Sequence, residues 1–334
     1  MKILRVFLCF ILIFSIVFTA IFAKRLISAK NQALSQNQYK GIISIWHVDS
    51  FEGGKGSRKQ FLMQISKEYE KQNPGILVCV IDQTFTSVKQ LMDEGQLPDV
   101  LSFGVGVPFS TPNELDVDCD FKGGKINDKT YAIPWCVGGY ALVTKKQEVS
   151  LLQDNHIENL IVSQGEYTQP MCALALEGYT ANNVFSFSPI DAYVNFLSAK
   201  DSVMIATQRD LIRLENRGVD VIVKPLTKYN DLYQYVSVYN TDEQKYPYVS
   251  TFVDYLLSQP TQSKLDSIGM SSLQTSITYE NDNLSNLFKI KSEYTVSPFT
   301  NEGALKNMQS QALQALKGNE QSLTTIKNSL VKCF

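Results

Sequence analysis

The chain has 334 residues, of which 44% are hydrophobic and 19% charged, and this composition excludes disorder as its main state. Its 31 lysines and arginines nearly balance 33 aspartates and glutamates, which argues against nucleic acid as a partner. With only two histidines, His47 and His156, the sequence offers few candidates for zinc binding or histidine catalysis.

The chain begins with an apolar run from Val6 to Ala23 that follows Lys2 and Arg5. This pattern predicts that residues 1–23 are a secretory signal peptide or a membrane anchor, and the length of the run leaves both alternatives open. Residues 24–38 are polar and lack a core pattern, which predicts a tether. The rest of the protein is therefore expected outside the cytoplasmic membrane, at the cell surface or in the periplasm.

Strands and helices alternate from residue 41 onward. Apolar and β-branched runs predict strands over 41–48, 76–81 and 98–103, and apolar residues at helical spacing predict helices over 58–72 and 86–95. This order is typical of a parallel α/β sheet. Further along, strands are predicted over 131–144 and 219–223, and helices over 189–199, 208–217, 251–257 and 301–330.

The glycine-rich loop 49–58 is the first candidate site. It follows a predicted strand and precedes a predicted helix, which is where ligands bind in open α/β sheets. Its Asp49 and Glu52 could accept hydrogen bonds from a ligand, but the loop matches neither a P-loop nor a dinucleotide fingerprint. The alternative is a tight turn that binds nothing.

The two tryptophans, Trp46 and Trp135, each lie in a strand beside a flexible turn. Aromatic faces pack against sugar rings, while carboxylates bind sugar hydroxyls. Trp46, Trp135 and Tyr140 could therefore form a sugar site with Asp49, Glu52 and Asp99. The alternative for each aromatic residue is packing in a core.

Catalysis is the competing interpretation. Asp49, Glu52 and Asp99 could meet as the carboxylates of a glycan hydrolase. Cys136 could be the nucleophile of a transferase, although a half-buried structural thiol is the more common case. Metal-ligand spacing is absent from the sequence, so neither a metal nor a cofactor is expected, and nothing fixes a disulfide pairing.

Five segments resemble the sugar-type solute-binding proteins of ABC importers, extracellular solute-binding protein family 1. They include EKQNPG at 70–75, LPDV at 97–100, YAIP at 131–134 and SVMIATQR at 202–209, and a fifth match spans 254–270. The resemblance covers most of residues 41–334. It implies a type II periplasmic-binding-protein fold, in which two α/β lobes enclose a ligand cleft.

The resemblance also implies how the chain is divided. Residues 39–138 and 235–292 would form lobe I, and residues 139–234 and 293–334 would form lobe II, with a hinge at Gly138 and Gly139. The ligand-binding residues that it implies are Trp46, Asp49, Glu52, Asp99, Ser102 and Phe103 on lobe I, Trp135 and Tyr140 at the crossover, and Thr207, Gln208 and Arg209 on lobe II.

The function that the resemblance implies is capture rather than chemistry. A monomer without a cofactor would close over a small polar solute, with sugar favoured, and deliver it to ABC permease subunits in the membrane. Two alternatives stay open: an enzyme on the same two-lobed frame, and a tethered sensor that reports a ligand to a signalling receptor.

Overall fold

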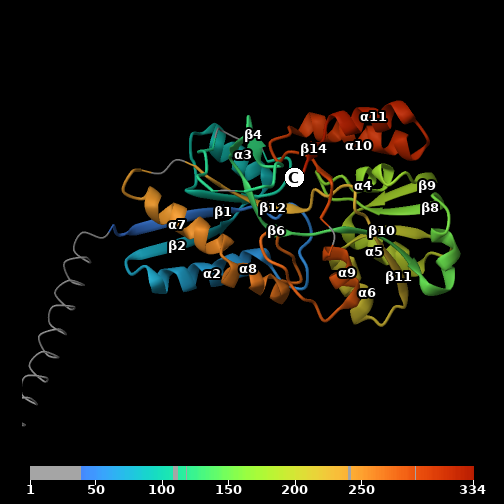
Figure 1. Cartoon of the computed structure of the whole chain (residues 1–334), viewed down its shortest axis with the longest axis horizontal. Helices are drawn as coiled ribbons and strands as arrows, with labels where there is room; N and C mark the ends of the chain where they lie inside the picture. The colour runs from blue at the N-terminus through green and yellow to red at the C-terminus, as the bar shows by residue number, and fades with distance from the viewer. Residues whose placement is uncertain (1–38, 108–111, 118, 240–241, 290) are drawn as a thin grey trace, which may run out of the picture.

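The computed structural model describes residues 39–107, 112–117, 119–239, 242–289 and 291–334. The expected signal peptide or anchor and the expected tether lie outside these residues. Figure 1 shows two α/β lobes side by side along the long axis, with the C-terminus near the middle. None of the helices in the described ranges combines the length and the apolar character of a membrane span.

The first lobe is built on a five-stranded sheet. Its strands run in the order β2 (Ile76–Asp82), β1 (Gly41–His47), β3 (Val100–Phe103), β12 (Tyr233–Val238) and β6 (Ile133–Val137). β1 pairs in parallel with β2 and β3, as the alternation of strands and helices predicts, whereas β12 is antiparallel to both of its neighbours. The predicted α/β class is therefore confirmed.

Helices cover both faces of this sheet. On one face, α2 (Arg58–Gln72) buries Phe61, Leu62 and Ile65, and its first turn is capped by the Ser57 hydroxyl, which accepts a hydrogen bond from Gln60 N at 3.3 Å. The shorter helix α3 (Phe85–Asp93) packs through Val88 against the other face. The lobe also contains α7 (Tyr246–Leu257), α8 (Gln259–Gln262), the 3₁₀ helix η2 (Ser263–Ile268) and the hairpin β4 (Lys125–Ile126) and β5 (Lys129–Thr130).

The second lobe has its own five-stranded sheet. The strand order is β11 (Val221–Pro225), β7 (Tyr140–Lys145), β10 (Val203–Thr207), β8 (His156–Ser163) and β9 (Thr180–Phe187). Its helices are η1 (Lys146–Leu152), α4 (Pro170–Leu176), α5 (Pro189–Ser198), α6 (Gln208–Asn216), α9 (Asp282–Phe288), α10 (Glu302–Leu316) and α11 (Glu320–Asn328). α10 and α11 pack on the α4 side of this lobe, as Figure 1 shows.

The chain passes from the first sheet to the second at residues 138–139, and some later segments lie in a different lobe from the one predicted. β6 ends at Val137 in the first sheet and β7 begins at Tyr140 in the second, so Gly138 and Gly139 form the first crossover. Leu284 and Leu287 of α9 pack in the core of the second lobe, although residues up to 292 were predicted in the first. The last residues, β14 (Val331–Lys332) and Cys333, return to the first lobe, where Cys333 packs with Phe121. β14 pairs there with β13 (Tyr294–Thr295).

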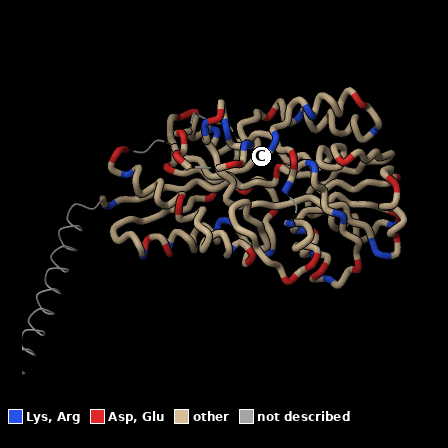
Figure 2. Tube along the Cα trace, in the orientation of Figure 1, with Lys and Arg blue, Asp and Glu red and all other residues tan. Residues whose placement is uncertain are grey.

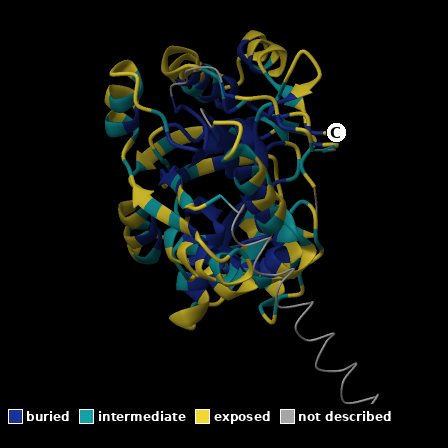
Figure 3. Ribbon diagram, turned by 90° about the vertical axis from the view of Figure 1, so that its left-hand side faces the viewer, coloured by how far each residue is buried: buried dark blue, intermediate teal, exposed yellow. Residues whose placement is uncertain are grey.

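Charge and burial are distributed as in an α/β protein whose sheets have helices on both faces. Acidic and basic residues are interspersed over both lobes (Figure 2). Buried residues concentrate in the strands, while the outer faces of the helices are exposed (Figure 3). A sheet covered on both faces places alternate strand residues in two separate cores, and neither set faces solvent.

This arrangement overturns the predicted role of both tryptophans. Trp46 is 7% exposed and packs with Val48 and Leu101 on one side of the first sheet. Trp135 is fully buried on the other side, where its ring stacks on Phe61 with centroids 5.8 Å apart. Both are core residues, because other segments of the first lobe cover the sheet on each side at these two positions.

Replacing Trp135 by alanine should therefore lower stability rather than remove a ligand contact. Loss of a buried indole ring leaves a cavity, and we expect the free energy of unfolding to fall by about 3–5 kcal/mol. Urea denaturation measures this change. Phe185, which is 45% exposed on β9, provides the control, and its replacement by alanine should cost less than about 0.5 kcal/mol. Equal midpoints for the Trp135→Ala variant and the wild type would contradict the assignment.

Candidate functional site

Two adjoining cavities open between the lobes, and one of them is lined by loop 49–58. One, of about 410 Å³, is lined by Asp49, Glu52 and Phe85 of the first lobe and by Glu166 and Pro189 of the second. The other, of about 880 Å³, shares Phe85 and Glu166 with the first. It is also lined by Lys89, Gly106, Tyr167, Phe299 and Glu302. Volumes of this size accommodate small organic ligands.

Aromatic rings from the two lobes meet between these cavities. The Phe85 ring, at the start of α3, contacts the Tyr167 ring edge-on, with centroids 4.8 Å apart. Tyr167 follows β8 in the second lobe. Burial and the nearby Glu166 raise the pKa of its phenol. Aromatic faces beside exposed carboxylates suit a ligand with apolar C–H faces and hydroxyl groups.

Sequence reasoning missed Phe85, Glu166, Tyr167 and Phe299 as candidate residues. Glu166 and Tyr167 follow β8, which runs parallel to β10 in the second sheet. The rule that ligands bind at the carboxyl ends of parallel strands could have found them, had β8 been predicted as a strand. Phe85 lies just beyond the carboxyl end of the parallel strand β2, so the same rule could have found it, whereas Phe299 has no comparable signal in the local sequence.

Asp49 is held in place by two basic side chains. Its carboxylate Oδ1 lies 2.8 Å from Arg58 Nη2 and 3.0 Å from His47 Nε2. Burial opposes the charged form, but the hydrogen bond from His47 and the charge of Arg58 outweigh it and keep the pKa of Asp49 well below its usual value. The carboxylate therefore remains ionised, with half of its side chain accessible from the cleft.

The predicted Ser102 and Trp135 support this loop from inside the core. Trp135 Nε1 and Gln234 Nε2 both donate to Ser102 Oγ, each at 3.1 Å. Since these two groups can only donate, the Ser102 hydroxyl donates its own proton to His47 Nδ1, 3.0 Å away. His47 then donates from Nε2 to Asp49. Ser102 is 1% exposed and its hydroxyl oxygen already accepts two hydrogen bonds. The chain of hydrogen bonds from Trp135 through Ser102 and His47 to Asp49 therefore holds the loop in place and offers no accessible nucleophile.

Asp99 and Phe103 lie outside the cleft, contrary to the prediction. Asp99 precedes β3, whereas Asp49 follows the parallel strand β1. The two carboxylates therefore lie at opposite ends of these neighbouring strands. Asp99 Oδ2 instead accepts from Ser44 N at 2.7 Å and pairs with Lys245 Nζ at 2.6 Å. Phe103 is fully buried in the core of the first lobe. A hydrolase pair that includes Asp99 is thereby excluded.

The resemblance places Thr207, Gln208 and Arg209 across the cleft from loop 49–58, and two of these residues contact the loop directly. Gln208, at the start of α6, is fully buried, and its Nε2 donates to Glu52 O at 2.7 Å. Its Oε1 accepts from Gly139 N at 3.0 Å, so one amide joins the loop, the crossover and the second lobe. Arg209 donates to Gly54 O. Thr207 caps α6 in a capping box with Asp210 and does not reach the loop.

Arg213 adds an ion pair that sequence reasoning did not identify. Its guanidinium binds the Glu52 carboxylate with both nitrogens, at 2.7 and 3.0 Å. The same group lies 3.4 Å from Asp210 Oδ1. Burial, with a further contribution from Glu52, raises the pKa of Asp210 to about 6. Glu52 is thus engaged with the second lobe through both its backbone carbonyl and its side chain.

The two crossover glycines are required by space rather than by backbone conformation. Neither has a positive φ. A Cβ atom on Gly138 would lie 2.6 Å from Gln208 Oε1, and one on Gly139 would lie 3.1 Å from Leu287. Glycine at these positions lets the two lobes approach closely.

Tyr140 is also placed in the interior and not in the cleft. Its hydroxyl donates to Asp231 Oδ1 at 2.7 Å, while Tyr229 OH and Gln169 N donate to Oδ2 at 3.1 and 2.7 Å. Asp231 is buried, and this burial raises its pKa to about 6 despite the three hydrogen bonds. The carboxylate therefore joins Tyr140, which follows the crossover, to Tyr229 and to the start of α4.

The chemistry of Cys136 argues against a transferase nucleophile. Its side chain is fully buried in the core of the first lobe, and burial raises the pKa of the thiol to about 12. A thiol of this kind stays protonated at neutral pH. Cys79, Cys136, Cys172 and Cys333 are free thiols. Among the described residues, no group of three His, Cys, Asp or Glu side chains could hold a metal ion.

The fold is shared with solved structures of two-lobed sugar-binding proteins. The sugar-binding protein MalE from Xanthomonas citri is 13% identical, with a TM-score of 0.58 over 86% of this chain and 96% of that chain. Apo RafE from Streptococcus pneumoniae is 13% identical, with a TM-score of 0.57 over 88% and 98%. The GacH receptor of Streptomyces glaucescens is 14% identical, with a TM-score of 0.55 over 87% and 97%.

These similarities define the class of fold as the two-lobed, type II periplasmic-binding-protein-like fold that the sequence motifs imply. No protein-family profile matches the sequence. No curated protein matches it either.

The ion pair between Arg213 and Glu52 should help to hold the lobes together. We expect Arg213→Ala to weaken this contact by about 1–2 kcal/mol, so that the lobes separate more often. Small-angle X-ray scattering of the ligand-free protein should show a larger radius of gyration. Arg217→Ala is the matched control, because Arg217 ends the same helix and lies over Tyr193 of its own lobe. Identical scattering from both variants would contradict this role for Arg213.

The raised pKa of Asp231 predicts a pH dependence of stability. Ionisation of this carboxylate costs more in the folded state than in the unfolded state, so the free energy of unfolding should fall as pH rises from 4 to 6. The shift from 3.8 to about 6 corresponds to about 3 kcal/mol. Asp231→Asn cannot ionise and should lose this part of the slope. Urea denaturation at several pH values tests it, and parallel curves for the two proteins would refute the prediction.

Proposed function

We propose that this protein is the extracytoplasmic substrate-binding component of an ABC importer and that it captures a sugar between its two lobes. The observation that carries the proposal is the cleft itself. Ionised Asp49, exposed Glu166 and the Phe85–Tyr167 pair come from different lobes and line adjoining cavities. A ligand there contacts both lobes and favours the closed arrangement through those contacts.

Proteins of the same fold support a sugar as the ligand class. Solved structures of related fold contain acarbose bound to GacH, raffinose bound to RafE and maltotriose bound to MalE from Bdellovibrio bacteriovorus. In the present chain, carboxylates and aromatic rings at the cleft provide the acceptors and flat apolar faces that such ligands require.

The same proposal includes the partners and the location of the protein. A monomer would act outside the cytoplasmic membrane, held there or released according to whether residues 1–23 are an anchor or a signal peptide. It would pass its solute to permease subunits in the membrane. Binding without chemistry is favoured over the enzyme alternative, because Asp99 lies apart from Asp49 and the Cys136 thiol is protonated.

The proposal predicts sugar binding that depends on Glu166. Isothermal titration calorimetry with maltotriose, raffinose and xylo-oligosaccharides should identify a ligand. Glu166→Gln should weaken its binding by about tenfold, because the side chain loses a charged acceptor. Glu158→Gln is the matched control, since Glu158 lies exposed toward the other end of β8.

Two results would count against the proposal. One is the absence of binding by any sugar in the panel, and the other is equal affinity in the wild type and Glu166→Gln. The same mixtures can be assayed for new reducing ends over time. Turnover of sugar by a sub-stoichiometric amount of protein would favour the enzyme alternative instead.

A further inference from the structure

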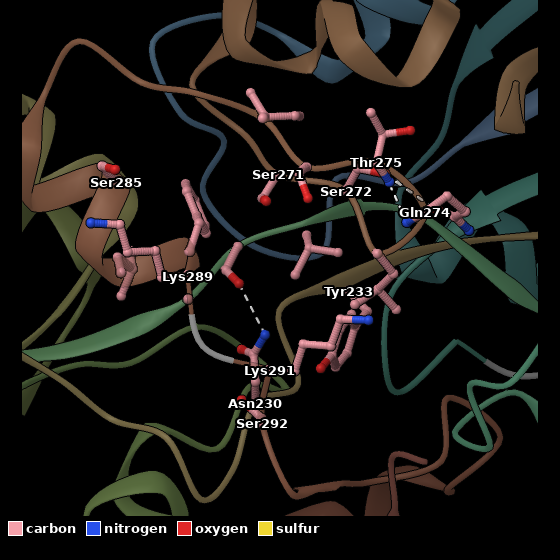
Figure 4. A pocket seen from close by; sticks show the side chains of 18 of the residues that line it. Asn230, Tyr233, Ser271, Ser272, Gln274, Thr275, Ser285, Lys289, Lys291 and Ser292 are labelled. Atoms are coloured by element: carbon pink, nitrogen blue, oxygen red, sulfur yellow. Dashed lines mark hydrogen bonds between the residues drawn. The ribbon is translucent and has the colours of Figure 1, made fainter. Parts of the chain in front are cut away.

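A separate cavity of about 530 Å³ lies at the crossover between the lobes. Segment 137–140 forms its floor and segment 271–278 forms one wall. The other wall consists of α9 residues together with Lys289, Lys291 and Ser292. Figure 4 shows Ser271, Ser272 and Thr275 on one side of the cavity and Ser285 on the other. Asn230 closes it from below and donates to Gly138 O at 2.9 Å.

This cavity is on the opposite side of the crossover from the sugar cleft. A side chain on Gly138 would point at Gln208, which contacts loop 49–58. A side chain on Gly139 would point at Leu287, which lines the cavity. Successive residues of an extended segment face opposite ways, so the crossover separates the cavity from the cleft.

The two walls of the cavity belong to different lobes. Ser271 exchanges two backbone hydrogen bonds with Val137, each 2.9 Å long, and Gln274 Nε2 donates to Pro134 O at 3.1 Å, so this wall is fixed to the first lobe. Leu287 of α9 packs in the core of the second lobe. Any rotation of one lobe against the other must therefore change the width of the cavity.

The side chains around the cavity indicate the chemistry of a ligand. Hydroxyl and amide groups predominate, and the charged residues among those described that line it are Lys289 and Lys291, without an aspartate or glutamate. Lys289 Nζ bonds to Asn286 Oδ1 at 3.1 Å on its own helix. Lys291 extends beside Tyr233 in Figure 4, with its Nζ 4.8 Å from the Phe334 ring centre. Two lysines at a cavity lined mainly by hydroxyl and amide groups suit a small anion that also carries hydroxyl groups.

We propose that this crossover cavity is an effector site for a small hydroxylated anion of the sugar acid or sugar phosphate class. Because the occupant contacts walls that move with different lobes, it stabilises the lobe arrangement present here, in which Gln208 and Arg213 contact loop 49–58. By linkage, an anion bound at the crossover changes the affinity of the cleft, and a cleft ligand changes the affinity for the anion by the same factor.

Direct binding provides the first test. Calorimetric titration of the full chain with glucuronate and with glucose 6-phosphate should show binding, and neutral glucose should bind at least about tenfold more weakly at this site. Lys291→Gln should weaken anion binding by about tenfold. Lys317→Gln removes the same charge at the end of α10 and should change nothing.

The second test concerns the lobes and needs no sugar in the cleft. Scattering of the ligand-free protein should shift toward the compact form when glucuronate is added, and Lys291→Gln should lose this shift. Absence of anion binding overturns the proposal, as does binding that Lys291→Gln leaves unchanged. Binding without any change in scattering overturns the effector role. None of these results depends on whether the cleft binds a sugar.

Discussion

The side-chain amide of Gln208 is the contact on which the geometry of the cleft depends. It is fully buried at the start of α6, and it joins Glu52 of the first lobe to Gly139 of the crossover. A buried amide must be fully hydrogen-bonded, because an unpaired donor or acceptor in a core costs about 1–3 kcal/mol. Any movement that separates the lobes has to break these bonds or replace them with bonds to water. Opening of the lobes therefore requires water to enter the cleft and to hydrogen-bond to the Gln208 amide.

The general architecture could be predicted from the sequence because it follows from repeating patterns. Apolar runs and helical spacing gave the parallel strands β1, β2 and β3, and the motifs at 70–75, 97–100 and 131–134 implied two lobes. The resemblance also placed Thr207, Gln208 and Arg209 across the cleft from loop 49–58, and in the structure Gln208 donates to Glu52 O and Arg209 to Gly54 O. These features depend on chain order, which a single sequence contains.

The individual site residues were predicted less well, for a definite physical reason. Trp46, Trp135 and Phe103 lie in strands whose two faces are both covered, so proximity to a loop did not make them accessible. Asp99 was grouped with Asp49 although it precedes its strand, and direction along a parallel strand decides which edge a residue reaches. Tyr167 and Phe85 meet only because two lobes come together, and spacing along the chain does not encode that.

The contacts between the lobes are weak enough for a ligand to control them. The Glu52 and Arg213 side chains are 24% and 19% exposed, and partly solvated ion pairs contribute about 1 kcal/mol. A ligand shifts the equilibrium between open and closed lobes only by the difference between its affinities for the two states. If contacts between the lobes contributed many kcal/mol, the lobes would stay closed with or without the ligand. The crossover glycines fit the same requirement, because they let the lobes meet closely without a side chain that would lock them. Among the described residues, a few hydrogen bonds and one ion pair join loop 49–58 to α6, and contacts of this strength are ones that a ligand in the cleft could outweigh.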